Sequence, residues 1–160
     1  VFEHAEADFC FIAGQKWADG TVEVAVVDEG RGVCTSLSEV YEIASDQEAL
    51  TQAIKPGISR TAGIEPNEHD NSGFGLYVLS EVGRNFGRFV IGSGSSALRL
   101  RIKNPPKTDD VSFKGTFVGL RLLSVPKDFA SVLDDIVQVG EEETGRQGKK
   151  RKASASSKEF

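Results

Sequence analysis

The chain has 160 residues, of which 39% are hydrophobic and 27% are charged, and its formal net charge is −5. These values are typical of one globular domain, and they exclude a collagen-like or wholly disordered chain. No run of 18 or more apolar residues is present, so no membrane-spanning segment is predicted. Cys10 and Cys34 form no CxxC pair, which favours a reduced, cytoplasmic location.

The charge is unevenly distributed along the chain. Residues 1–140 carry 13 basic and 20 acidic side chains, a net charge of −7. An acidic body argues against nucleic acid as the main partner, because phosphate neutralisation dominates such binding. Residues 141–160 contain an acidic run, a basic run and a Ser/Ala run, with no apolar residue larger than alanine before the last position. We predict a disordered charged tail there.

The first half of the chain begins with two β-type segments. Residues 9–13 and 21–27 are predicted strands, and the Asp19-Gly20 pair between them indicates a hairpin turn. The second segment becomes wholly apolar before it ends at Asp28, as a central strand would. Residues 1–6 are expected to be the last turn of a helix that begins further upstream.

A long connection of mixed character follows, and we interpret residues 34–72 as a lid. It contains two short helical patterns, over residues 37–44 and 47–54, and a polar run from 59 to 72. A partly regular connection of this length is usually functional or mobile. Apolar residues then recur at helical spacing from Leu76 to Phe86, which predicts a helix.

Three more strands are predicted, over residues 88–91, 97–102 and 116–122. Residues 92–96 are the expected turn between the first two, and Asn104-Pro105-Pro106 is expected to break the chain before the third. Pro126 is expected to start a final helix over residues 126–139. The predicted fold class is α+β: a two-layer sandwich over residues 1–140, with a mixed, mostly antiparallel sheet of about five strands covered by helices on one face.

Two glycine-bearing stretches carry the chemistry. In the run Val27-Asp28-Glu29-Gly30-Arg31-Gly32, the glycines permit positive φ and close approach to a ligand, and a buried aspartate can accept a hydrogen bond from an adenine amine. In Asn71-Ser72-Gly73-Phe74-Gly75-Leu76, the glycines open a helix whose free N–H groups and dipole favour phosphate. Taken alone, the first stretch is more typical of an ordinary turn, and the second is a weaker signal still. Together they predict the two walls of a nucleotide pocket.

The order strand, DxGxG, lid, SGxGL, helix, hairpin, GT, strand resembles the GHKL (Bergerat-fold) ATP-binding domain over roughly residues 1–124. The resemblance implies ATP as the ligand, with Mg²⁺. It assigns the adenine amine to Asp28, the base pocket to Gly30 and Gly32, and a position near the aspartate to Thr116. The remaining implied ATP-binding residues are His4, Arg60 in the lid, and the phosphate-wrapping run Ser72, Gly73, Phe74, Gly75 and Leu76.

The sequence departs from the family pattern at its start. His4-Ala5 resembles the end of the family's first motif, whose Mg²⁺-binding Asn would precede Val1. The N-terminal helix is therefore expected to be truncated, and neither a metal ligand nor a catalytic residue is identified in this sequence.

Three functions remain open at this point. The lid and the SGFGL form most resemble the kinase branch: the ATP-binding domain of a histidine kinase, or of an anti-sigma-type serine kinase, that acts on a protein phosphoacceptor. A catalytically weak ATP-gated switch or ATPase would instead regulate a partner through its lid. A scaffold that binds no nucleotide is the third possibility.

Overall fold

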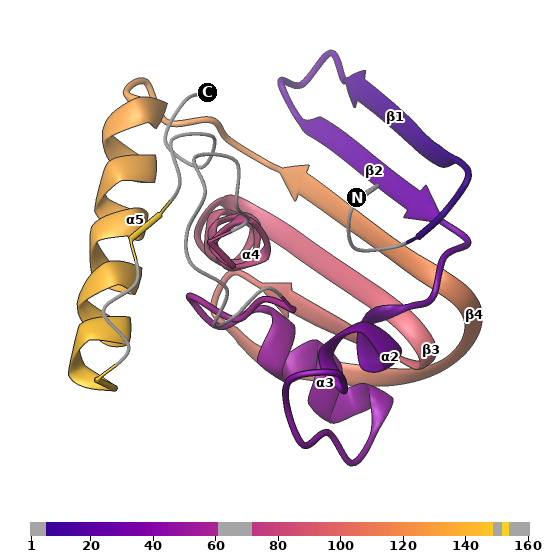
Figure 1. Cartoon of the computed structure of the whole chain (residues 1–160). Helices are drawn as coiled ribbons and strands as arrows, with labels where there is room; N and C mark the ends of the chain where they lie inside the picture. Colours follow the sequence, from indigo (N-terminus) through magenta and orange to yellow (C-terminus); the bar gives the residue numbers. More distant parts are fainter. Residues whose placement is uncertain (1–5, 61–71, 149–151, 154–160) are drawn as a thin grey trace.

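The computed structural model describes residues 6–60, 72–148 and 152–153. Four antiparallel strands form one sheet in the order β1-β2-β4-β3, and helices pack on one of its faces (Figure 1). The predicted α+β class is confirmed. The sheet has four strands where about five were predicted, and no parallel pair occurs within it, so the predicted mixed character is wrong.

Strands β1 (Cys10–Lys16) and β2 (Val22–Asp28) form the predicted hairpin. Asp19 accepts a hydrogen bond from the Thr21 N–H, and Gly20 has a φ of 86°, which explains the Asp-Gly pair in this turn. Strand β2 ends at Asp28, as predicted. It pairs with β1 on one side and β4 on the other, so it occupies an interior position in the sheet.

Strands β3 (Gly87–Arg101) and β4 (Asn104–Leu122) form one long hairpin in place of the three separate strands predicted. The chain reverses near residues 92–96, as predicted, but it does so by a bend within β3, where the register is irregular. The Ile102 N–H donates to the Gly87 carbonyl at 3.3 Å, so the two ends of β3 meet. Figure 1 shows the whole hairpin folded back on itself.

The break predicted at Asn104-Pro105-Pro106 is wrong, because β4 begins at Asn104. The ladder is irregular beside the two prolines: Arg101 pairs with Asn104, and regular pairing resumes at Arg99 and Lys107. Proline lacks an N–H donor and is tolerated where a strand starts or its pairing is interrupted. Both conditions hold here.

The lid region contains helices α2 (Val33–Leu37) and α3 (Asp46–Ala53). The helix predicted over 47–54 is confirmed, and Ser45 caps it by accepting the Glu48 N–H. The helix predicted over 37–44 is wrong, since the helical turn ends at Leu37. Asp46 also accepts the Ser95 N–H at 2.8 Å, which fixes the start of α3 against the bend of β3.

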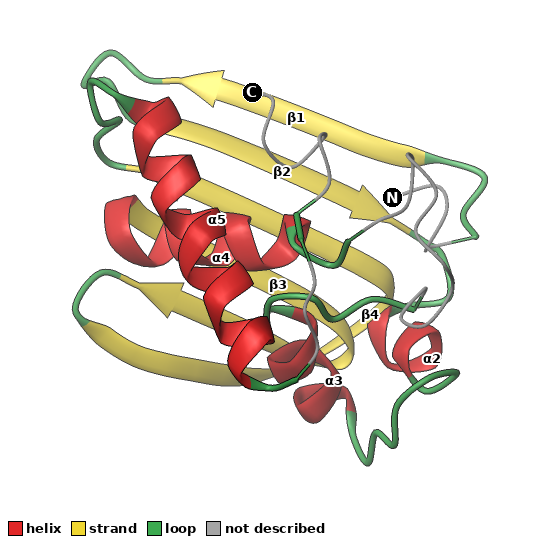
Figure 2. Cartoon of the chain, turned by 60° about the vertical axis from the view of Figure 1, so that its left-hand side comes forward, coloured by secondary structure: helices red, strands yellow, loops and turns green. Residues whose placement is uncertain are grey.

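Helix α4 (Gly75–Phe86) lies on β3 and carries the apolar residues predicted from its spacing. Val78 and Val82 belong to one core cluster with residues of the last helix, whereas Leu76 and Leu79 pack against a second cluster that contains Phe89 and Ile91. Helix α4 therefore contributes to two parts of the core. It lies between α5 and the sheet (Figure 2).

Helix α5 (Phe129–Arg146) packs against α4. It begins three residues after Pro126, with the Asp128 side chain accepting the Ser131 N–H as its N-cap. It also runs beyond the predicted end at residue 139. The prediction of disorder is therefore wrong for residues 141–146, because the helix continues through them, while most of the remaining tail lies outside the described residues.

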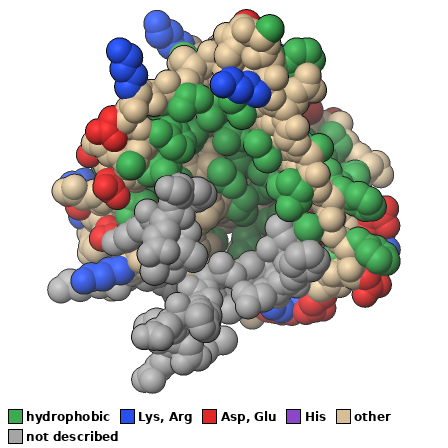
Figure 3. Space-filling model, turned by 90° about the horizontal axis from the view of Figure 1, so that it is seen from above, with side chains coloured by type: hydrophobic (Ala, Val, Ile, Leu, Met, Phe, Trp, Pro, Cys, Tyr) green, Lys and Arg blue, Asp and Glu red, His purple; other side chains and the backbone are tan. Residues whose placement is uncertain are grey.

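The helices do not cover the sheet evenly. They pack on β3 and β4, and hydrophobic side chains of the β1–β2 hairpin stay exposed, among them Ile12 (70%) and Val24 (40%). Figure 3, a view from above, shows hydrophobic side chains gathered around a hollow in that face of the molecule. Among the described helices, none is both long enough and apolar enough to span a membrane.

Candidate functional site

The candidate site is built on a row of polar residues that crosses three strands. Asp28 on β2 pairs with Thr116 on β4, and Thr116 pairs with Ser93 on β3. Side chains of directly paired residues point to the same face of a sheet. The predicted proximity of Thr116 to Asp28 is therefore confirmed, and Ser93 joins them although the sequence indicated only a turn at that position.

Asp28 is a buried carboxylate, with 5% of the residue exposed. One of its oxygens, Oδ1, accepts the Gly30 N–H at 2.9 Å. No ion pair to Asp28 occurs within residues 6–60, 72–148 and 152–153. A buried carboxyl group without a paired cation can accept a further hydrogen bond from a ligand, which makes Asp28 a candidate ligand-binding group.

Ser93 connects the loop after β2 to strand β4. Its hydroxyl accepts the Val33 N–H at 3.0 Å and donates to the Gly115 carbonyl at 2.7 Å. Gly32, just before Val33, has a φ of 78°, and a Cβ there would lie 2.7 Å from Ser93 Oγ. Gly32 thus has the positive φ that the sequence predicted. Gly30 does not, so its predicted positive φ is wrong, and its part in the site is its hydrogen bond to Asp28.

Gly115 allows β4 to lie directly against the end of β2. Its φ is 91°, and a Cβ on it would lie 2.1 Å from the Asp28 carbonyl oxygen. Only glycine combines this φ with so close a backbone contact. The Gly115-Thr116 pair therefore brings the threonine into register with Asp28.

The N-terminus of α4 lies at the same end of the sheet as Asp28. Helix α4 leads directly into β3, and the first half of this strand, from Gly87 to Ser93, reaches the level of Thr116 and Asp28. The twelve residues of α4 span about 18 Å, and the six steps from Gly87 to Ser93 span about 20 Å. Because α4 packs against β3, its first residue, Gly75, returns to this end (Figure 2).

The glycines before α4 have different roles. Gly73 has a φ of 75°, and a Cβ on it would lie 2.6 Å from the Ile58 carbonyl oxygen. Its own carbonyl accepts the Gly57 N–H at 3.2 Å, so this segment packs on the turn that follows α3. A Cβ on Gly75 would meet no atom of the described residues within 4 Å, so none of them fills the space beside the first turn of α4.

Two residues of the predicted phosphate-wrapping run pack their side chains in the core. Phe74 is fully buried, with its ring 6.1 Å from that of Tyr77, and Leu76 packs against the second core cluster. Their side chains are therefore structural, and only their backbone groups remain for a ligand. Phe74 as N-cap makes no side-chain hydrogen bond to the helix. Ser72 lies in the loop just before it.

Arg60, predicted to reach a γ-phosphate, takes part in a four-residue ion network. Glu6 binds Arg31 at 2.8 Å and Arg60 at 3.2 Å, and Glu39 binds both arginines as well. The network joins the DxGxG loop to both ends of the described lid. Neither glutamate was identified from the sequence, because nothing in its spacing relates positions 6, 39 and 60. His4 lies outside the described residues.

The hydrogen bond from Arg31 lowers the pKa of Glu39 below its ordinary value of 4.5, and the charges of Arg31 and Arg60 add to this effect. A depressed carboxyl pKa stabilises the folded chain at pH values above the unfolded pKa, and this contribution is lost as the pH falls through the folded pKa.

We expect Arg31→Gln to return the Glu39 pKa toward 4.5, as measured by NMR titration of the side-chain carboxyl. Arg84→Gln, on α4, is the control. An unchanged Glu39 titration in Arg31→Gln would contradict the network.

Compared with models of known protein families and with curated proteins, the chain matches none of them. The site is therefore interpreted from its own residues. Five of its residues lie together at one end of the sheet: Asp28, Gly32, Ser93, Gly115 and Thr116. The N-terminus of α4 lies at that same end.

Proposed function

We propose that this chain is the ATP-binding domain of a histidine kinase-like or anti-sigma-type protein kinase of the GHKL superfamily, which binds ATP–Mg for phosphoryl transfer to a protein. The observation that carries the proposal is Asp28, a buried carboxylate without a paired cation in the described chain, in register with Thr116. Asp28 Oδ1 accepts the Gly30 N–H, and the carboxylate can accept a further hydrogen bond from a ligand.

Adenine supplies such a donor through its exocyclic amine. A carboxylate accepts that amine hydrogen bond, whereas guanine presents a carbonyl oxygen at the corresponding position and would meet repulsion. Gly32 and Gly115 allow the loop after β2 and strand β4 to pack closely against Ser93 and Asp28, which holds the polar groups of the site together. The hydroxyl of Thr116 offers a second polar group beside Asp28.

The phosphates would lie toward the first turn of α4. This turn has no side-chain cap, and no described residue fills the space beside Gly75, so its N–H groups and the helix dipole favour an anion there. Arg60 and Arg31 are the cations of the lid network, and phosphate binding by either would require exchange of its present carboxylate partners. Positioning and charge neutralisation of this kind dominate phosphoryl transfer.

Mg²⁺ is not matched by a site in the described chain. Its residues include no group of three or more His, Cys, Asp or Glu side chains that would hold a metal ion. Mg²⁺ commonly binds through substrate phosphates with few protein ligands.

A second function is favoured by the ion network. Glu6 and Glu39 hold Arg31 and Arg60 in a closed arrangement at the edge of the lid, and a nucleotide that draws either arginine away would change the position of the lid. The chain would then act as an ATP-gated switch. Transfer of label from γ-labelled ATP to a protein supports the kinase, whereas a change in lid hydrogen exchange without transfer supports the switch.

Asp28→Asn tests the nucleotide site in both cases. We expect it to weaken ADP binding by about tenfold to a hundredfold, because a hydrogen bond to a charged group contributes about 1.5–3 kcal/mol. Titration calorimetry with Mg–ADP gives the affinity, and Mg–GDP tests the base preference. Asp135→Asn, an exposed aspartate on α5, is the matched control. Equal ADP affinity in Asp28→Asn and Asp135→Asn would refute the adenine assignment.

A further inference from the structure

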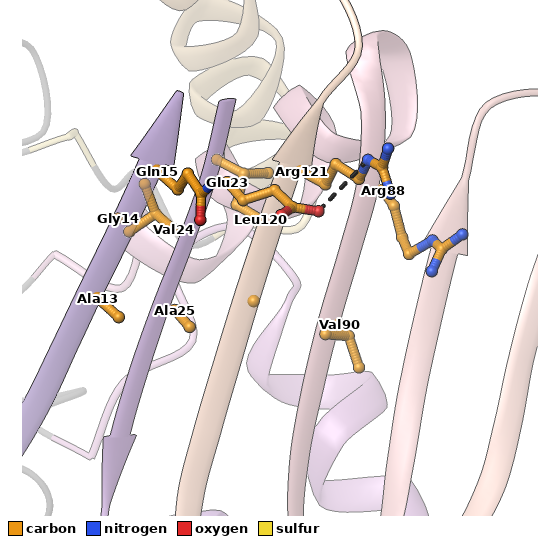
Figure 4. Close-up of a pocket in the computed structure, with 11 residues that line it drawn as sticks. Ala13, Gly14, Gln15, Glu23, Val24, Ala25, Arg88, Val90, Leu120 and Arg121 are labelled. Atoms are coloured by element: carbon orange, nitrogen blue, oxygen red, sulfur yellow. Dashed lines mark ion pairs between the residues drawn. The ribbon is translucent and has the colours of Figure 1, made fainter. Parts of the chain in front are cut away.

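The face of the sheet opposite the helices has a groove that crosses all four strands. Its floor is one row of paired residues, none of them larger than valine: Ala13, Ala25, Gly119 and Val90. The hollow over this row measures about 410 Å³ (Figure 4). It lies on the opposite face from the nucleotide site, because Asp28 and Thr116 share the helix-covered face with Val118 and Leu120.

Two ridges border this floor, each two residues away along the strands. One ridge is apolar: it includes Phe11, which is 70% exposed, and Phe117, whose ring occupies the space over Gly92. The other ridge is charged and runs through Glu23, Arg121 and Arg88.

The dimensions of the groove fit a helix. The ridges are four residues apart along each strand, which corresponds to about 14 Å, and a helix with its side chains is about 10–12 Å wide. Four strands span about 14 Å across the sheet, which is the length of about ten helical residues. A short helix of two to three turns therefore fits between the ridges.

The charged ridge has an excess of positive charge. Arg121 pairs with Glu23 at 3.4 Å, and nearby Arg99 pairs with Asp109 at 2.7 Å. Arg88 and Arg101 have no ion-pair partner among the described residues. Arg88 also lies directly opposite Arg121, an arrangement of like charges that destabilises a strand pair.

The surroundings of Arg88 are consistent with this excess. Burial, and then the charges of Arg101, Arg121 and Arg99, lower the pKa of Arg88 from its ordinary value. An anionic partner would relieve the repulsion among these arginines. Residues 1–140 carry a net charge of −7, so a cluster of arginines is unusual in this part of the chain. Such a cluster favours an acidic binding partner.

We propose that this groove binds a short amphipathic helix of a partner protein, with apolar side chains on the floor and acidic side chains toward Arg88 and Arg101. The apolar floor and ridge require hydrophobic contacts that a phosphate backbone does not make. The negative charge of the body also opposes nucleic acid, whereas an acidic helix needs only the local arginines.

A synthetic peptide tests the proposal without knowledge of the natural partner. The probe is a fluorescein-labelled amphipathic helix with leucine on one face and glutamate elsewhere, and its anisotropy is followed with the full chain. One comparison peptide has lysine in place of glutamate, and another has serine in place of leucine. We expect the Leu/Glu peptide to bind at least about tenfold more tightly than either.

Variants locate the binding surface. Arg88→Glu together with Arg101→Glu should weaken the Leu/Glu peptide by at least about tenfold, and Ala25→Trp should block the floor without a change of charge. Arg146→Glu, an exposed arginine on α5, gives the same change of charge per site elsewhere and should leave affinity within about twofold. Trp17 provides a local readout: its indole N–H donates to Glu23 at 2.8 Å, and it is the only tryptophan.

Several outcomes would overturn the proposal. One is that the Leu/Glu peptide does not bind even at millimolar concentration. Another is that the serine peptide binds as tightly as the Leu/Glu peptide. The third is that the Leu/Glu peptide binds the double arginine variant with unchanged affinity. A short duplex DNA could also displace the peptide. If it binds more tightly than the peptide and loses binding in the double arginine variant, this face is assigned to nucleic acid. Each variant is first checked for an unchanged urea midpoint, so that loss of binding is separated from loss of folding.

Discussion

Gly115→Ala should lower the free energy of unfolding by about 2–6 kcal/mol and remove nucleotide binding. A side chain at a φ of 91° costs about 1–3 kcal/mol, and the Cβ would lie 2.1 Å from the Asp28 carbonyl oxygen, which adds about 1–3 kcal/mol of overpacking. The contact is between two backbones, so no side-chain rotation relieves it. Urea unfolding followed by circular dichroism measures the loss.

Gly20→Ala is the matched control for this variant. Gly20 has a φ of 86°, close to that of Gly115, but a Cβ there meets nothing within 4 Å. It therefore reports the cost of the backbone conformation alone, which we expect to be about 1–3 kcal/mol. Equal losses in the two variants would show that the approach of β4 to Asp28 contributes nothing.

Phe89→Ala should cost about 3–5 kcal/mol, which is a large part of the stability of a domain of this size. Phe89 is fully buried and lies in one cluster with Leu50 of α3 and Leu98 and Leu100 of β3. Its removal leaves a cavity where α3 meets the sheet. The same urea titration measures the effect.

Phe11→Ala is the control for Phe89→Ala, because it removes the same atoms from a residue that is 70% exposed. We expect its effect to stay below about 1 kcal/mol. Phe89→Leu fills most of the cavity and should recover more than half of the loss. A Phe89→Ala value near that of Phe11→Ala would mean that the second core cluster does not hold α3 in place.

Local signals predicted the elements that short-range chemistry decides. The Asp19-Gly20 turn, the end of β2 at Asp28 and the apolar spacing of α4 are all encoded within a few residues, and they are confirmed. The helix over 37–44 failed because its apolar pattern is short and α2 ends at Leu37. The end of α5 was missed because charged residues can continue an exposed helix without an apolar signal.

The candidate site was predicted only in part, because its remaining contacts depend on long-range pairing. Asp28 and Thr116 have recognisable motifs. Ser93 acts through Gly115 and Val33, which no local pattern relates to it. The network of Glu6, Glu39 and two arginines likewise joins distant positions. The β3–β4 hairpin was split into three strands because glycines, serines and prolines, which usually end strands, instead bend this one.

The pairing of β2 with β4 also determines when the proposed nucleotide site can form during folding. Strands β1 and β2 join through a short turn, as do β3 and β4, so each hairpin can form early from local contacts. Positions 28 and 116 meet only when the two hairpins join, which requires closure of a much longer loop. A nucleotide that binds between them recognises the joined sheet alone, so it should slow unfolding without accelerating the formation of either hairpin.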